Sequence, residues 1–140
     1  DPFSTGFPVV PDKSTEFVGA ELVALKYPFK GPSRRIQGIE LSSDQLSDYH
    51  KFMGTTLISG RTLMQSLDSL MKSPNYRTDE TRVYDGEVRT REINAITKVI
   101  SAYKTAARAE LYRKYPDLMS EVNARKINNR AGTRLLETNR

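Results

Sequence analysis

The residues DGEVRTREINAITKVISAYKTAARAELYRKY, 85–115, form the longest helical pattern in the chain. Their apolar members recur every three or four positions and so lie on one face of an α-helix: Ile93, Ile96, Ile100, Tyr103, Ala107 and Leu111. Arg113 and Lys114 occupy the last turn, as the helix dipole favours, and Pro116 stops the helix because it lacks an amide hydrogen. At 1.5 Å per residue this helix is roughly 45 Å long, and other helices or another chain must cover its apolar stripe.

Two shorter helices precede it. Ser42 and Gln45 have the spacing of a capping box, and apolar residues at helical spacing then continue the pattern to about Ser59, before Gly60. A second helix is predicted from Thr62 to Lys72. We expect the long helix to pack against both, through contacts of Ile96, Ile100, Tyr103 and Ala107 with Leu46, Met53, Leu63, Leu67 and Leu70.

Residues 1–13, DPFSTGFPVVPDK, contain three prolines, which disfavour helix and keep this arm extended. Its apolar residues are too many for a solvated linker: Phe3, Phe7, Val9 and Val10. We expect them to anchor the arm on a neighbouring subunit, with this chain's own core as the alternative surface. Ser14 or Thr15 then caps a short helix, although the same segment is also compatible with a strand.

The remaining segments complete a mainly α architecture built around the long helix. Residues 36–41 suggest a brief extended segment, and no alternation is long enough for a sheet. A fourth helix after Pro116 is marked by Leu118, Met119, Val122 and Ile127. The expected organisation is an extended arm with at most a short helix over 1–35, a small helical domain over 36–128, and a basic tail over 129–140 that is either frayed or docked elsewhere.

Charge is unevenly distributed along the chain. Residues 1–84 carry ten basic and ten acidic residues, whereas residues 85–140 carry twelve basic and seven acidic ones, a difference that equals the net charge of +5. Such a basic half suits either an acidic partner or a solvated helix face.

No apolar run approaches the length of a membrane span, and we expect no membrane-spanning helix. The chain begins with Asp1, and we expect a piece of a longer polypeptide, with processing as the alternative.

Catalytic and metal chemistry is not indicated. The chain has no cysteine, which excludes disulfides and thiol catalysis, and its one histidine, His50, lies on the apolar side of a predicted helix. Four glutamates can in principle act as acid and base, but their spacing brings no two together, and surface positions are expected: Glu16, Glu21, Glu40 and Glu92. The glycines match no phosphate-binding pattern. We therefore expect no enzyme, no metal and no cofactor.

Tyrosines and arginines alternate near and within the long helix, which is compatible with contacts to a nucleic acid. The basic residues that would make such contacts are Arg108, Arg113, Lys114, Arg125, Lys126 and Arg130. Tyr103 and Tyr115 lie close to the apolar stripe and are interpreted as core residues with their hydroxyls at the rim.

Three segments together carry a resemblance to a known class of protein. They are RIQGIELSSDQLSDYHKFMG, LDSLMKSPNY and INAITKVISAYKTAAR, the last followed by PDL at residues 116–118. The shared features are Ile36, Gly38, Ile39, Leu41, Gln45, Tyr49, Gly54, Leu67, Leu70, Ser73, Pro74, Tyr76, Ile96, Val99, Ile100, Tyr103, Ala107, Arg108, Pro116, Asp117 and Leu118. Over residues 34–118 the chain resembles a C-terminal segment of large virion proteins of tailed bacteriophages, of the internal (ejection) or tape-measure kind.

This resemblance implies a structural segment of a phage particle, assembled in the bacterial cytoplasm. Its partners would be portal, tail or internal proteins within a homo- or hetero-oligomeric assembly, and the resemblance carries no catalytic role to these residues. We expect contacts from Phe3, Phe7, Val9 and Val10 in the arm and from Leu135 and Leu136 in the tail. The alternative is a DNA-contacting module that uses the basic C-terminal half.

Overall fold

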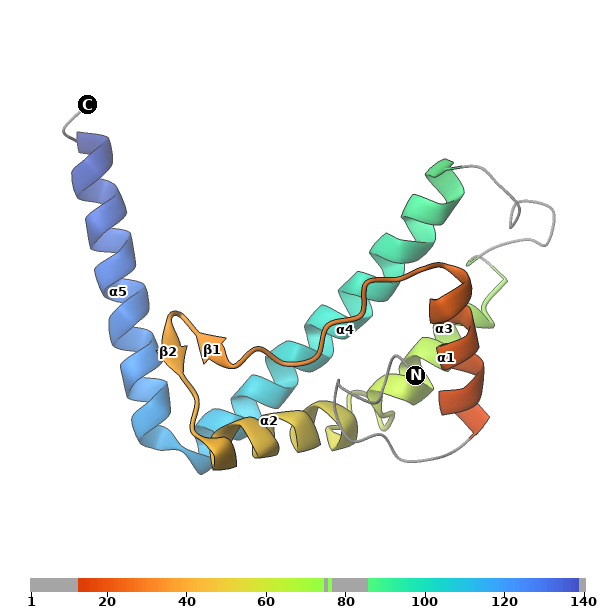
Figure 1. Cartoon of the computed structure of the whole chain (residues 1–140), viewed down its shortest axis with the longest axis horizontal. Helices are drawn as coiled ribbons and strands as arrows, with labels where there is room; N and C mark the ends of the chain where they lie inside the picture. Colours follow the sequence, from red (N-terminus) through yellow and green to blue (C-terminus); the bar gives the residue numbers. More distant parts are fainter. Residues whose placement is uncertain (1–12, 75, 77–85, 139–140) are drawn as a thin grey trace.

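The computed structural model describes residues 13–74, 76 and 86–138, with side chains over 14–74, 76 and 91–130 (Figure 1). The described elements are α1 (Lys13–Ala24), β1 (Arg35–Ile36), β2 (Ile39–Glu40), α2 (Ser43–Thr55), α3 (Leu63–Met71), α4 (Gly86–Lys114) and α5 (Pro116–Thr138). The chain is therefore mainly α, as predicted, and it is built around one long helix, α4. The N-terminal contact residues Phe3, Phe7, Val9 and Val10 lie outside the described residues.

Helix α4 spans 29 residues and agrees with the prediction for 85–115 to within one residue at each end. Its stripe is buried from Ile96 to Leu111, whereas Ile93, at the start of the predicted stripe, is only partly buried. Pro116, however, also begins the next helix: it is the first residue of α5, where a proline loses no intrahelical hydrogen bond. A single residue, Tyr115, therefore joins α4 to α5, and its carbonyl accepts the first bond of α5 from the Met119 amide at 3.2 Å.

Helices α2 and α3 begin at matching caps. The predicted capping box is present, with Gln45 N donating to Ser42 Oγ at 3.1 Å and Ser42 N donating to Gln45 Oε1 at 2.9 Å. A second box, which the sequence analysis missed, joins Thr62 and Gln65 at the start of α3. Each box satisfies amide groups that a helix start leaves without partners.

The end of α2 differs from the prediction. The helix stops at Thr55 rather than near Ser59, because the Gly54–Thr55–Thr56 run is a weak helix former and Thr56 is already extended. Ile58 and Arg61 then form a two-residue turn through Ser59 and Gly60, both with positive φ.

A short β-hairpin stands where only an extended segment was expected. Arg35 pairs with Glu40 and Ile36 with Ile39, so the expectation of no sheet is wrong for this segment. Gln37 and Gly38 make the turn with φ of 52° and 79°, the combination typical of a type I′ turn. Strands of two residues are too short to show alternation in the sequence, which is why the pairing was missed.

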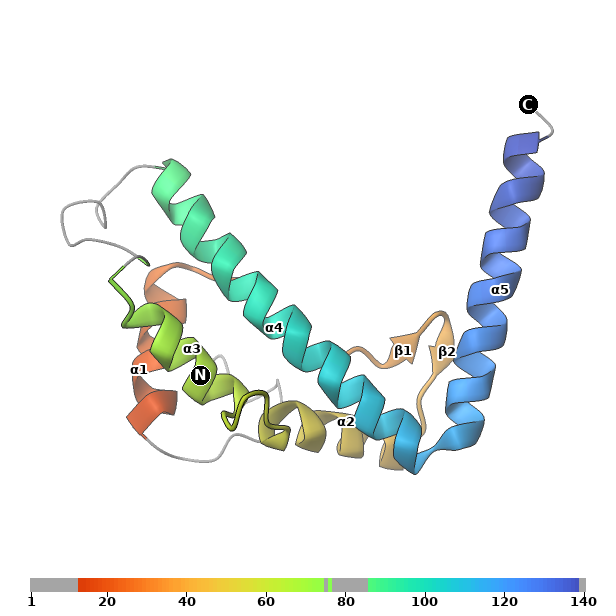
Figure 2. The same cartoon turned by 180° about the vertical axis from the view of Figure 1, so that it is seen from behind.

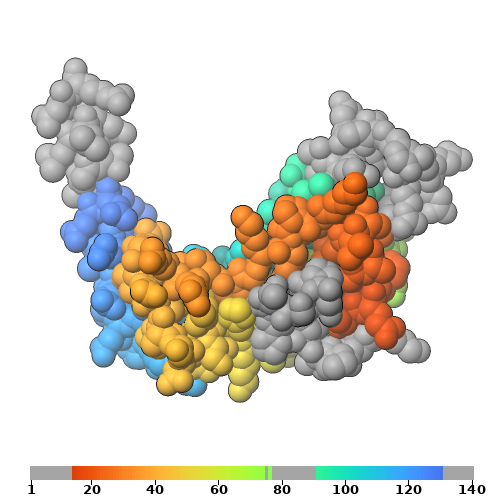
Figure 3. Space-filling view, in the orientation of Figure 1, coloured from red at the N-terminus to blue at the C-terminus, as the bar shows by residue number. Residues whose placement is uncertain are grey.

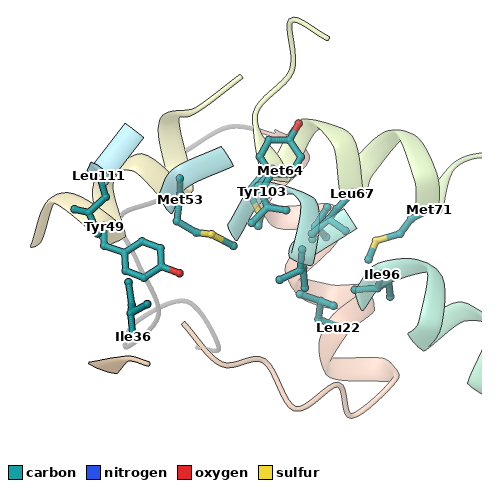
Figure 4. Close-up of a cluster of buried hydrophobic side chains, with 14 of the residues drawn as sticks. Leu22, Ile36, Tyr49, Met53, Met64, Leu67, Met71, Ile96, Tyr103 and Leu111 are labelled. Atoms are coloured by element: carbon teal, nitrogen blue, oxygen red, sulfur yellow. The ribbon is translucent and has the colours of Figure 1, made fainter. Parts of the chain in front are cut away.

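The core lies between α4 and the three helices that precede it. α2 and α3 pack on α4, and α1 packs on α3. Figure 4 shows the resulting cluster, in which Leu22 of α1, Leu67 of α3 and Ile96 of α4 meet. All the residues predicted to pack together belong to this one core, with Leu46 and Leu70 partly buried against it. The contribution of α1 through Val18 and Leu22 was not anticipated.

Helix α5 leaves this core. Leu118 and Val122 are buried at its base, whereas every described side chain after them, from Asn123 to Arg130, is exposed. Ile127, which was expected to pack, is 65% exposed. The helix nonetheless continues to Thr138, past the tail boundary predicted near residue 128. α4 and α5 diverge from the corner at Tyr115 as the two limbs of an open V (Figures 1 and 2).

Candidate interaction surfaces

Residues 123–138 of α5 are called the α5 arm below, and the described residues before them are called the helical body. Within the described side chains of the arm, Arg125, Lys126 and Arg130 are basic and no residue is acidic. Figure 3 shows the described part of α5 lying beside the hairpin. Helical segments of this length are marginal in water when nothing packs on them. The arm is therefore the described segment whose helix would gain most from packing against a partner.

The hairpin turn contacts the α5 arm from within the chain. Asn129 Nδ2 donates to Gln37 Oε1 at 3.4 Å, and the Arg125 guanidinium lies beside Gly38, where an added Cβ would be 3.9 Å from its Nη1 atom. The hairpin turn thus supports one side of the α5 arm, from Arg125 to Asn129. The opposite side, which includes Ile127, has no such support.

The corner between α4 and α5 is held by a polar cluster centred on Asp48 of α2. The Asp48 carboxylate accepts a hydrogen bond from the Tyr115 hydroxyl at 2.5 Å and forms an ion pair with Lys114 at 2.8 Å. The hydrogen bond from Lys114, followed by that from Tyr115, lowers the pKa of Asp48 below its ordinary value. The same carboxylate raises the pKa of Lys114 and that of Tyr115.

The six predicted nucleic-acid contacts separate into two groups. Three of them have a partner within the chain: Arg108 donates to the Tyr49 hydroxyl through Nε at 2.8 Å, Arg113 pairs with Glu110 at 2.5 Å, and Lys114 pairs with Asp48. The other three, Arg125, Lys126 and Arg130, are exposed on the α5 arm. The structure does not bring the six together on one surface.

The two predicted tail contacts, Leu135 and Leu136, lie in the last turns of α5, and their side chains are outside the described set. His50 is half-buried on α2, where it lines an open depression with Ser43, Leu46, Ser47 and Lys51. This position agrees with a partly packed histidine.

Two glutamates that were expected at the surface are buried. Glu21 is 4% exposed and Glu92 3% exposed. Glu21 lies three residues after the core residue Val18 of α1, and Glu92 lies four residues before the core residue Ile96 of α4. This helical spacing turns both side chains toward the core. Glu92 also lines a small cavity of about 130 Å³ beside Leu70.

Across the described part of the chain, no group of three or more His, Cys, Asp or Glu side chains has the arrangement of a metal site. In that same part, no helix combines the length and apolar character needed to cross a membrane.

The chain matches no known protein-family model, no curated protein and no solved structure. Its function is therefore inferred from the surfaces described above and from the sequence motifs.

Proposed function

We propose that this chain is a non-enzymatic structural segment of a phage virion protein and that it docks onto other virion subunits through the α5 arm. The observation that carries the docking proposal is the exposure of every described arm side chain, from Asn123 to Arg130, on a helix that continues to Thr138. The motifs over residues 34–118 support the virion context. They fall on the hairpin and on α2, α3 and α4, which form the body that holds the arm.

The physical argument for docking concerns what keeps the arm helical. A helix nucleates at a cost, and most helices in proteins are stabilised by packing rather than by propensity. The arm has one described hydrogen bond to the hairpin, and its large apolar side chain Ile127 faces solvent. A partner that covered Ile127 would gain on the order of 1.5–3 kcal/mol from burying it fully.

The test is incorporation into particles. Phage particles are produced in bacteria with the segment carried in its parent protein, and purified particles are analysed by mass spectrometry. Ile127→Glu should be depleted from particles while the melting temperature of the chain itself is unchanged, because Ile127 is exposed in the free chain. Asn128→Glu is the matched control: it adds the same charge at the next exposed position, a quarter-turn around the helix, and should be retained.

Two results would contradict different parts of the proposal. Absence of the unmodified segment from particles would rule out the virion role. Equal incorporation of Ile127→Glu and Asn128→Glu would show that this face of the arm is not the docking surface.

The second candidate function is contact with the genome, and it is favoured by the charge of the same arm. Arg125, Lys126 and Arg130 are exposed, without an acidic side chain among residues 123–130. Binding to DNA through such residues weakens by orders of magnitude between low and moderate salt, because counterions are released from the phosphates. Binding to virion proteins that survives the same increase in salt supports docking to protein instead.

A further inference from the structure

The loop between α1 and β1 lies along one flank of α4, and specific contacts hold it there. The Tyr27 hydroxyl hydrogen-bonds with Thr97 Oγ1 at 2.8 Å, Phe29 packs against the core, and Pro32 is buried. Figures 1 and 2 both show this coil running beside α4. Lys30, which lies between Phe29 and Pro32, is therefore carried to the flank of α4 by anchored neighbours.

Two more cations stand on that flank. Lys104 and Arg108 are one helical turn apart on α4, so their side chains project on the same side. Arg108 uses Nε to donate to Tyr49, and this bond leaves the guanidinium's terminal amino groups out of the interaction. The Lys30, Lys104 and Arg108 group is called the cation cluster.

The positive charges of the cation cluster repel one another. Burial lowers the pKa of Lys104, and the positive charges of Arg108 and Lys30 lower it further. Within the described residues, no ion pair joins Lys30 or Lys104 to a carboxylate. A half-buried ammonium beside two cations is unfavourable in the free chain, and a bound anion would relieve that repulsion.

We propose that Lys30, Lys104 and Arg108 form a binding site for a phosphate group. A phosphate offers several oxygens to several donors at once, which suits two ammonium groups and a guanidinium better than a single carboxylate does. Arg108 is already oriented by Tyr49, so less side-chain freedom is lost when an anion binds. The phosphate belongs either to a small polyphosphate or to a nucleic-acid backbone. The proposal does not depend on the docking of the α5 arm.

The experiment titrates the full chain with inorganic tripolyphosphate and, separately, with a short DNA duplex, each followed by calorimetry at low salt. Lys104→Gln should weaken binding about tenfold, which corresponds to the loss of one charged hydrogen-bond donor. Lys98→Gln is the matched control, because it removes the same charge from an exposed position of α4 away from the cluster, and it should change binding less than about twofold. Lys104→Gln should also melt no lower than the unmodified chain, since it removes a repelled charge. Lys30→Gln, in the loop, provides a second variant that leaves α4 intact.

The outcomes separate the two sources and decide the proposal. Dependence on Lys104 and Lys30 with tripolyphosphate assigns the site to small phosphates, and the same dependence with DNA alone assigns it to a nucleic-acid backbone. If neither probe binds, or if Lys98→Gln weakens binding as much as Lys104→Gln and Lys30→Gln do, the proposal is wrong.

Discussion

The helical body and the α5 arm are both made of regular helix, yet they are held in different ways. In the body, α4 buries a stripe from Ile96 to Leu111 against α2 and α3, so packing and helix formation support each other. In the arm, the side chains from Asn123 to Arg130 are exposed, and Asn129 hydrogen-bonds to Gln37 of the hairpin turn. The chain thus contains a helical segment whose described side chains are not buried, and the exposed side chains of the α5 arm are accessible to a partner.

The largest effect is expected from breaking α4 in the middle. Val99→Pro removes an intrahelical hydrogen bond and clashes with the preceding turn, at a cost of about 3 kcal/mol or more. Because the core is spread along α4 on both sides of this position, loss of the helix should unfold the body and the arm together. Circular dichroism and thermal melting measure the change. An unaltered spectrum and melting temperature would mean that α4 is not one continuous helix.

Truncating one buried side chain should lower the stability of the body without breaking a helix. Ile100→Ala leaves a cavity beneath a side chain that is 5% exposed, and the expected cost is about 2–5 kcal/mol by chemical denaturation. Ile127→Ala on the arm is the control and should change stability by less than about 0.5 kcal/mol. Unchanged stability in Ile100→Ala would indicate that this face of α4 is exposed in the isolated chain and is covered only on assembly.

The cap of α3 tests the body at a smaller scale. Thr62→Ala removes the side chain that accepts from the Gln65 amide at 3.3 Å, and should cost about 1 kcal/mol. Arg61 and Ser66, which flank this cap in sequence, both hydrogen-bond with the Tyr103 hydroxyl, so hydrogen exchange in α3 should accelerate as well. Thr62→Ser keeps the hydroxyl and should be close to neutral.

The smallest effect is expected at the corner, where the two regions meet. The pKa of Asp48 is lowered in the folded chain, so its contribution to stability is present above its ordinary value of 3.8 and is lost as the pH falls through the lowered value. Asp48→Asn should therefore melt below the unmodified chain at pH 7, and the difference in melting temperature should shrink as the pH falls from 3.8 through the lowered pKa. Glu121→Gln, exposed on α5, serves as the control. A difference in melting temperature that does not change as the pH is lowered below 3.8 would contradict the role assigned to the ionised carboxylate.

Much of the body could be predicted because its signals are local and periodic. The three- and four-residue spacing from Ile96 to Leu111 reports a face that must be buried, and the Ser42–Gln45 box marks a helix start directly. The hairpin was missed for the opposite reason, since its turn residues Gln37 and Gly38 follow no strong turn motif and its strands are too short to alternate.

The interaction surfaces were harder to predict because they depend on residues far apart in sequence. Asp48 meets Lys114 and Tyr115 across 66 and 67 positions, and the loop that carries Lys30 lies along α4 because Tyr27 hydrogen-bonds to Thr97 and Phe29 packs against the core. Nothing in the spacing of these residues announces the contact. The arm was interpreted as a tail after residue 128, because a helix without a buried face lacks the apolar pattern that predictions of helices rely on.

Because only Tyr115 joins α4 to α5, the junction fixes both the direction of α5 and which of its side chains face the hairpin. Since 3.6 residues complete a turn, inserting one residue between Pro116 and Leu118 would rotate every later side chain by about 100° about the helix axis and advance it by about 1.5 Å. Leu118 and Val122 would then leave their buried positions, and Asn129 would turn away from Gln37. The number of residues between the corner and the hairpin contact is therefore constrained, because it sets which side of α5 faces the hairpin.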